Sequence, residues 1–79
     1  MGRSRLGIVV PARNEEKTIK KVIVSLKKHG DVLVVDDAST DKTFFIIKHL
    51  QTKFIKNKIN LGYEATVQKG IKYLLKKNY

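Results

Sequence analysis

The chain has 79 residues, no cysteine and a formal net charge of +10. This length allows one small domain that buries only about 60% of its unfolded surface, and the lack of cysteine excludes disulfides and thiolate metal ligands. No apolar run approaches the ~20 residues that span a bilayer, and residues 1–5 lack the apolar core of a signal peptide. We therefore expect a cytoplasmic protein.

The positive charge is concentrated in the second half of the sequence. Residues 42–79 contain nine lysines and a single acid, Glu64, whereas residues 1–41 contain eight basic and six acidic residues. A lysine-rich half can cover solvated helix faces, or it can make the chain a small basic module that binds nucleic acid or an anionic membrane surface. Tyr63 and Tyr73 are not interleaved with the lysines as base stacking requires. We therefore expect no specific nucleic-acid partner and leave peripheral contact with the inner membrane surface as an alternative.

The first predicted elements are a buried strand and an amphipathic helix. Residues 6–10 are almost all apolar, as in a parallel strand, and Pro11 ends the run because it has no N–H for a sheet ladder. Asn14 is a good helix N-cap, and apolar residues then recur from Ile19 with helical spacing. We expect this helix to end at Gly30 in a left-handed conformation.

The rest of the chain repeats this alternation. Residues 32–35 predict a second buried strand, residues 41–51 a helix, residues 54–55 a weak edge strand among lysines, and residues 64–77 a last helix. The apolar side chains expected to be buried are Phe44, Ile47 and Leu50, then Phe54, then Val67, Ile71, Leu74 and Leu75. Strand and helix in strict alternation produce a parallel sheet with right-handed crossovers. The sequence therefore predicts an α/β fold, a three-layer Rossmann-like βαβαβα arrangement whose unpaired sheet edge invites self-association.

Polar residues follow the first two predicted strands. The segment PARNEE (residues 11–16) follows the first, and Asp36 and Asp37 follow the second. In an open α/β sheet these positions share one rim, where ligands bind. Asn14 and Glu15 can equally serve as helix caps, Asp36 can hold its own loop through backbone N–H groups, and Asp41 is more typical of a cap than of a ligand.

Several other chemistries are excluded by the pattern. Residues 11–14 stand where a dinucleotide fold needs G-x-G-x-x-G, and no phosphate-binding P-loop sequence occurs. His29 and His49 lack metal-ligand spacing, and no serine or cysteine lies in a nucleophile motif. A receiver domain would need the acid pair after its first strand and a further acid after its third. We therefore predict no catalytic residue and no metal ligand within the chain.

Three segments make the chain resemble the start of a family-2 glycosyltransferase. They are IVVPARNEE (residues 8–16), VVDDASTDKT (residues 34–43), and NLGY (residues 60–63) with Ala65, Gly70 and Ile71. In this order and spacing they are specific, and they extend over nearly the whole chain. Their forms are most similar to members that glycosylate polyprenyl phosphates.

The resemblance implies the N-terminal half of a GT-A fold, which binds the nucleotide of a UDP-, GDP- or dTDP-sugar. The whole enzyme would transfer the sugar to a hydroxyl or a lipid phosphate. Pro11, Ala12 and Arg13 would line the nucleoside pocket, and Glu15 would lie beside the ribose. Asp37 would accept an N–H of the base. The remaining residues implied at the pocket are Asp36 and Ser39 beside Asp37, and Asn60 and Gly62 on the far wall.

The chain also departs from the family pattern. Members continue to a D-x-D motif that binds Mg²⁺ or Mn²⁺, and to a later acid that deprotonates the acceptor. No D-x-D occurs in this sequence, and without the metal nothing neutralises the departing diphosphate. We therefore expect residues 1–79 to be a single truncated nucleotide-sugar-binding domain that binds no cofactor and is not catalytic alone. Its expected partner is a missing C-terminal catalytic half.

Overall fold

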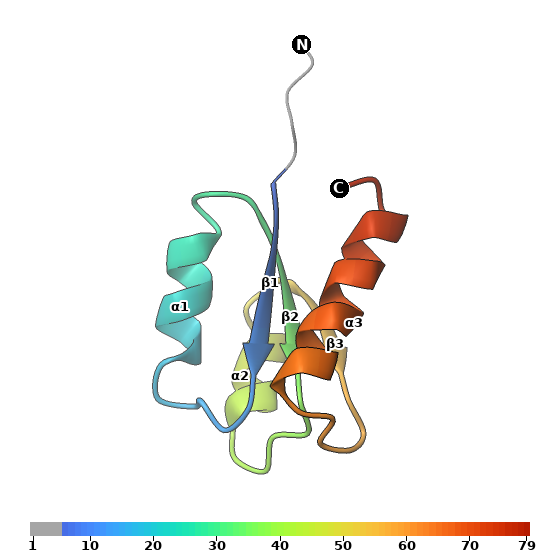
Figure 1. Cartoon of the computed structure of the whole chain (residues 1–79). Coiled ribbons are helices and arrows are strands. Elements are labelled where there is room, and N and C mark those ends of the chain that lie inside the picture. Colours follow the sequence, from blue (N-terminus) through green and yellow to red (C-terminus); the bar gives the residue numbers. More distant parts are fainter. Residues whose placement is uncertain (1–5) are drawn as a thin grey trace.

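The computed structural model describes residues 6–79, which form a three-stranded parallel sheet with helices on both faces (Figure 1). Residues 1–5, in which we expect no signal peptide, lie outside the described part. The elements in chain order are β1 (Gly7–Ala12), α1 (Ile19–Leu26), β2 (Asp31–Asp36), α2 (Thr43–Lys48), β3 (Lys53–Lys56) and α3 (Tyr63–Lys76). The predicted α/β Rossmann-like arrangement is confirmed, and β2 lies between β1 and β3 in the sheet.

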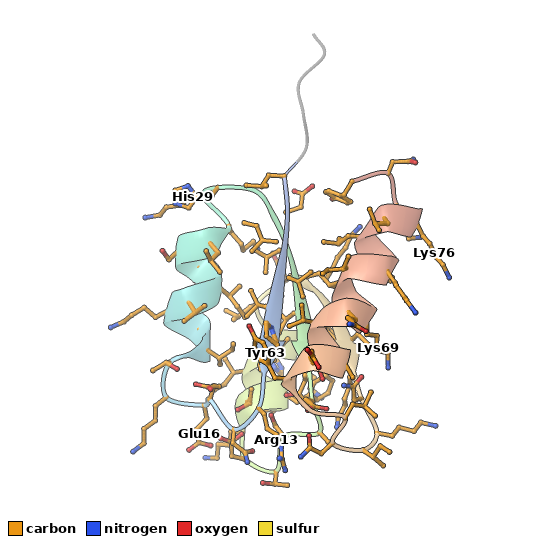
Figure 2. The ribbon with its side chains drawn as sticks, in the orientation of Figure 1. Arg13, Glu16, His29, Tyr63, Lys69 and Lys76 are labelled. Atoms are coloured by element: carbon orange, nitrogen blue, oxygen red, sulfur yellow. The ribbon has the colours of Figure 1, made fainter. Side chains whose placement is uncertain are left out.

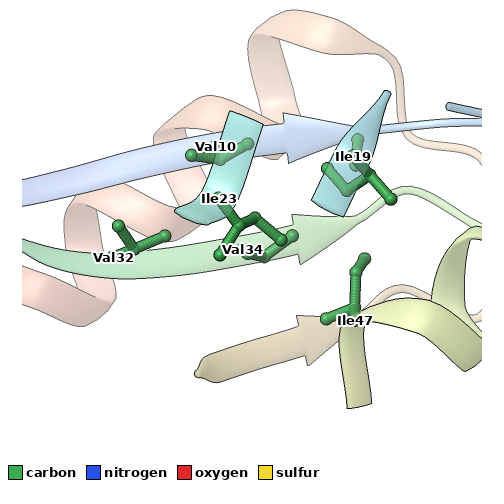
Figure 3. Close-up of a cluster of buried hydrophobic side chains, with 7 residues drawn as sticks. Val10, Ile19, Ile23, Val32, Val34 and Ile47 are labelled. Atoms are coloured by element: carbon green, nitrogen blue, oxygen red, sulfur yellow. The ribbon is translucent and has the colours of Figure 1, made fainter. Parts of the chain in front are cut away.

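The central strand β2 is buried because helices cover both of its faces. α1 and α2 pack on one face, and α3 packs on the other (Figure 1). The buried side chains of the first face are Val10, Ala12, Ile19, Ile23, Val32, Val34 and Ile47 (Figure 3). Those of the second face are Leu33, Val35 and Leu74.

Strand β1 continues through Pro11, where we had expected it to end. The carbonyls of Leu6 and Ala12 accept hydrogen bonds from residues 31 and 37, so the even-numbered residues of β1 face β2. The backbone of Pro11, an odd-numbered residue, faces away from β2. That side is the open edge of the sheet, because β1 has a strand neighbour on one side only. A proline is tolerated there since no ladder N–H is needed. The strand therefore carries Ala12 to the rim.

The expected caps of the first helix were wrong. α1 begins after Thr18, and Asn14 adopts a left-handed conformation with φ of 53° four residues earlier. Gly62, with φ of 92°, is the glycine with positive φ among residues 6–79. Gly30 is needed for close approach instead, since a Cβ on it would lie 2.5 Å from the Leu6 carbonyl oxygen.

Helix α3 turns a different face to the sheet from the one that its apolar residues predict. Leu74 is buried as expected, but Ile71 is 45% exposed and Leu75 is 63% exposed. The helix packs instead through Gly70, where a Cβ would lie only 2.6 Å from Cγ1 of Val9. Close backbone approach therefore decides the orientation of α3, and its apolar stripe lies along a groove beside the open edge of β1.

Two further observations concern the molecular surface. Phe54, which we expected in the core, is 40% exposed on the edge strand β3. Its ring packs edge-to-face on Phe44, with centroids 5.3 Å apart. No helix within residues 6–79 is long and apolar enough to cross a membrane.

Candidate functional site

A cleft of about 340 Å³ opens at the carboxyl ends of the strands. Figure 2 shows Arg13 and Tyr63 toward this end of the molecule, with His29 at the opposite end. The lining residues are Pro11, Ala12, Arg13, Glu15, Asp37, Asn60, Gly62, Tyr63 and Thr66. The fold thus brings seven of the predicted pocket positions together, although they come from three separate segments. Their role in binding stays a prediction.

Asp37 joins three segments of the chain at the base of this cleft. Its side chain is 5% exposed. Oδ1 accepts hydrogen bonds from the Leu61 backbone N–H at 2.7 Å and from Nδ2 of Asn57 at 3.0 Å. Oδ2 accepts one from the Gly62 backbone N–H at 2.9 Å. The Asp37 backbone N–H donates to the carbonyl of Ala12 at 2.8 Å, so one residue holds β1, β2 and the 57–62 loop together.

These contacts keep Asp37 ionised although it is buried. Burial alone raises the pKa of the Asp37 carboxyl, but hydrogen bonds from Leu61, Asn57, Gly62 and the Thr66 hydroxyl outweigh it and hold the pKa below its ordinary value of 3.8. A carboxylate oxygen has two acceptor positions. Oδ1 accepts two hydrogen bonds, Oδ2 accepts the one from Gly62, and the Thr66 hydroxyl donates a further one to the carboxylate. Thr66 also lines the cleft, so a ligand N–H or O–H that binds Asp37 would do so beside or in place of the Thr66 hydroxyl.

Asp36 and Ser39 were predicted pocket residues, and the structure places neither on the cleft wall. The Asp36 side chain is fully buried. Its Oδ1 accepts the Ser39 hydroxyl at 2.6 Å and its Oδ2 accepts the Ser39 backbone N–H at 3.2 Å. Ser39 Oγ in turn accepts the Asn14 backbone N–H at 2.9 Å. The pair fixes the loop after β2 and positions the loop after β1.

Asn14 joins these two loops instead of capping a helix. Its Oδ1 accepts the backbone N–H groups of Thr40 at 2.8 Å and Asp41 at 3.3 Å. Beside it, the Glu15 backbone N–H donates to Oγ1 of Thr43 at 2.8 Å. Burial raises the pKa of Asp41, but hydrogen bonds from the Thr43 hydroxyl and from nearby backbone N–H groups lower it below 3.8. Asp41 is thus a loop-holding acid, as its position before a helix favours.

Sequence reasoning missed the polar side chains behind Asp37. Asn57 and Thr66 are both buried, and Nδ2 of Asn57 lies 3.3 Å from Oγ1 of Thr66. The ammonium of Lys69 donates to Oδ1 of Asn57 at 2.8 Å. One signal was available: Asn57 follows the third predicted strand, so it falls on the same rim as Asp37. Its lysine neighbours, however, are typical of a solvated edge strand.

The acids at the end of β2 do not fit a divalent cation. All four carboxylate oxygens of Asp36 and Asp37 accept hydrogen bonds from protein N–H or O–H donors, which a cation would have to displace. No group of three or more His, Asp or Glu side chains in the described part of the chain is arranged to hold a metal. A Mg²⁺ or Mn²⁺ ion in a full-length enzyme therefore needs ligands other than this pair.

Comparison with known proteins identifies the family of this chain. The family model described as glycosyl transferase family 2 matches residues 7–77. The chain is 39% identical over 77 residues to the uncharacterized protein MJ0544 of Methanocaldococcus jannaschii, covering 89% of this chain and 34% of that protein. It is 44% identical over 46 residues to the UDP-N-acetylglucosamine--dolichyl-phosphate N-acetylglucosaminyltransferase of Methanococcus voltae, covering 56% of this chain and 18% of that protein.

A parallel sheet between helices, with a polar cleft at the carboxyl ends of its strands, places the chain in the class of Rossmann-like α/β folds. Within that class, the chain belongs to glycosyltransferase family 2. The expected resemblance is confirmed, and the arrangement of elements is that of the N-terminal half of such a domain. The chain spans about a third of the length of MJ0544 and of MJ1222, a second M. jannaschii relative that is 38% identical to it.

Proposed function

We propose that this chain binds the nucleotide part of a nucleotide-sugar donor. The observation that carries the proposal is the buried, ionised carboxylate of Asp37, which lines the cleft. A heterocycle that presents a ring N–H, such as uracil, thymine or guanine, matches this acceptor. Donors of the UDP-, dTDP- and GDP-sugar classes are therefore the candidates.

The other lining residues supply what a nucleotide needs besides the base contact. The Glu15 carboxylate accepts hydrogen bonds from ribose hydroxyl groups, and the Arg13 guanidinium offers positive charge to a phosphate. Pro11 and the exposed ring of Tyr63 provide apolar surface on which a base can lie. In this arrangement Asn60 and Gly62 form the opposite wall.

For the whole protein we propose sugar transfer to a hydroxyl or to a lipid phosphate. The M. voltae relative is named for transfer to dolichyl phosphate, which favours the lipid phosphate. Such an enzyme would work in the cytoplasm at the inner membrane surface. The ligands of the Mg²⁺ or Mn²⁺ ion, and the base that deprotonates the acceptor, would belong to a further part of the polypeptide. In MJ0544 about two-thirds of the protein lies outside the part that matches this chain. Residues 1–79 alone would then bind nucleotide without transferring sugar.

A nucleotide titration followed by ¹⁵N NMR tests the proposal. UDP, GDP and dTDP are added to the labelled chain, with CDP as the matched control because its N3 carries no hydrogen. We expect shifts at residues 11–15, 37 and 60–63, and UDP binding about tenfold tighter than CDP, the discrimination that one satisfied hydrogen bond supplies. Shifts confined to the lysines of α3, or equal affinity for UDP and CDP, would contradict the proposed base contact.

A further inference from the structure

A chain of polar side chains runs from the cleft to the surface of α3. It begins at Asp37, continues through the buried Asn57, and ends at the exposed Lys69, which Figure 2 shows on α3 near the level of the strand ends. Asn57 is 2% exposed, and its backbone N–H donates to the carbonyl of Asp36 at 2.8 Å. Neither Asn57 nor Lys69 lines the cleft, so neither is a direct contact for a ligand there.

Lys69 decides which way the carboxamide of Asn57 points. An ammonium group only donates hydrogen bonds, so its 2.8 Å contact requires the amide oxygen on that side. The amide nitrogen is then directed at Oδ1 of Asp37 and Oγ1 of Thr66. The reverse orientation would set the amide oxygen against a carboxylate and the NH₂ group against an ammonium, which is unfavourable at both ends.

The orientation of Asn57 in turn determines what Asp37 offers to the cleft. Asn57 and Leu61 donate to Oδ1 and Gly62 donates to Oδ2, so Asn57 is one of the contacts that fix both carboxylate oxygens relative to the cleft. Three donors in fixed positions also prevent rotation of the carboxylate about its last side-chain bond. Leu61 and Gly62 belong to the loop that walls the cleft, so the same contacts hold that wall.

We propose that Lys69 and Asn57 are positioning residues of the cleft: Lys69 orients the Asn57 carboxamide, and Asn57 holds the Asp37 carboxylate in the orientation in which it meets a ligand. The nature of the ligand rests on the function proposed above, whereas the orientation of Asp37 does not. The other charged side chains that line the cleft with Asp37 are Arg13 and Glu15.

Replacement of the Lys69 ammonium tests this inference. Lys69→Met keeps an unbranched side chain of similar length and removes the charge. Lys72→Met is the matched control, since Lys72 is exposed on the same helix and the loss of charge is identical. Lys69→Arg retains a cation that only donates hydrogen bonds. Thermal unfolding followed by circular dichroism establishes that each variant folds.

Two readouts separate positioning from a general loss of charge. In the ligand-free chain, ¹³C NMR follows the titration of the Asp37 carboxyl, and we expect its pKa to rise by at least about 0.5 in Lys69→Met. The side-chain NH₂ resonance of Asn57 should move in the same variant. The second readout is UDP affinity, which we expect to fall about threefold to tenfold. Lys69→Arg should keep the Asp37 titration and the UDP affinity close to those of the unmodified chain. Lys72→Met should change the two readouts only as far as the loss of one net charge does.

The outcomes distinguish this inference from the proposed function. Equal effects of Lys69→Met and Lys72→Met on the Asp37 titration would overturn the positioning role. If none of UDP, GDP and dTDP binds the unmodified chain while Lys69→Met alone shifts the Asp37 titration, the positioning role stands and the proposed function fails. If UDP binds and Lys69→Met leaves both the Asp37 titration and the UDP affinity unchanged, the proposed function stands and the positioning role fails.

Discussion

Asp36 and Asp37 are adjacent in the sequence, yet their carboxylates hold different parts of the molecule. Asp36 lies on the side of β2 toward Ser39 and closes its own loop. Asp37 is the first residue after the strand and reaches the 57–62 loop through three donors. Only Asp37 also lines the cleft. Successive side chains of an extended chain point in opposite directions, so Asp36 supports a loop whereas its neighbour Asp37 is the candidate binding acid.

The depressed pKa values predict how stability depends on pH. Because the pKa values of Asp37 and Asp41 are lower in the folded chain than their ordinary value of 3.8, the unfolded chain binds protons more readily. The stabilisation is fully present above about pH 4 and is lost as pH falls through the folded pKa values below that. We expect the free energy of unfolding in urea to fall steeply below about pH 4.

Asp37→Asn isolates the part of this effect that belongs to Asp37. The substitution should lower the free energy of unfolding by about 1–3 kcal/mol at pH 7, because the NH₂ group of the new asparagine would face N–H donors. The difference from the unmodified chain should shrink toward pH 2 as the Asp37 carboxylate becomes protonated. Glu64→Gln is the control, since Glu64 is exposed. An equal loss of stability at pH 7 and pH 2 in Asp37→Asn would contradict this account.

At the scale of elements, helix α3 shows how backbone approach can override apolar patterning. The apolar residues of α3 predict a buried face that includes Ile71 and Leu75, but the helix rests on the sheet through Gly70 and Leu74. Val9 and Val35 fill the space where a side chain on residue 70 would lie. Rotation toward the predicted face would separate Gly70 from the sheet and open a gap.

Gly70→Ala should therefore destabilise the chain although alanine favours helices. The helix propensity gain is about 1 kcal/mol, whereas forcing a Cβ to within 2.6 Å of Val9 displaces a stiff β-branched side chain. Overpacking of this kind costs about 1–3 kcal/mol. We expect a net loss of about 1 kcal/mol in urea unfolding. Gln68→Ala on the exposed surface of α3 should change stability by less than about 0.5 kcal/mol, and a more stable Gly70→Ala would show that the helix can shift.

The two neighbouring leucines of α3 provide a second test of its orientation. Leu74→Ala removes a buried side chain and should cost about 2–4 kcal/mol of unfolding free energy. Leu75→Ala removes one that is 63% exposed and should cost less than about 1 kcal/mol. Chemical denaturation of both variants under one condition measures the difference. Equal losses would mean that α3 buries the face its sequence predicts.

At the scale of the whole molecule, the sheet ends in two unlike edges. β3 carries lysines at both ends, a common protection against pairing with another chain. The groove beside the open edge of β1 has an uncharged lining, which is Leu6, Gly7, Val9, Ile71, Leu74, Leu75 and Tyr79. The groove itself therefore adds no charge to the repulsion between copies of a chain with a net charge of +10.

This asymmetry predicts self-association through the β1 edge. We expect the weight-average sedimentation coefficient of the chain to rise with concentration between about 10 μM and 1 mM, the range in which weak exposed interfaces form. Leu75→Lys places a charge in the groove and should suppress the rise. Phe45→Lys, at an exposed residue of α2, is the control and should leave it in place. A coefficient that does not depend on concentration in the unmodified chain would contradict the prediction.

The order of the elements, the parallel sheet and the rim on which polar residues gather could all be predicted from the amino-acid sequence. These follow from the spacing of apolar residues and from strand direction, which are properties of neighbouring residues. Helix ends were less well predicted, because the amide of Asn14 binds a loop about 26 residues away instead of its own helix.

The placement of the individual rim residues, in contrast, depends on contacts that form in the folded chain. The tertiary structure separated Asp37 from Asp36, added Asn57 and Lys69 behind the cleft, and set the face of α3. The contacts of Asp37 and of Gly70 join segments far apart in the chain, and the position of α3 also depends on whether a given space is already filled. The spacing of apolar residues along the chain reports neither which distant segments meet nor how much space is left between them.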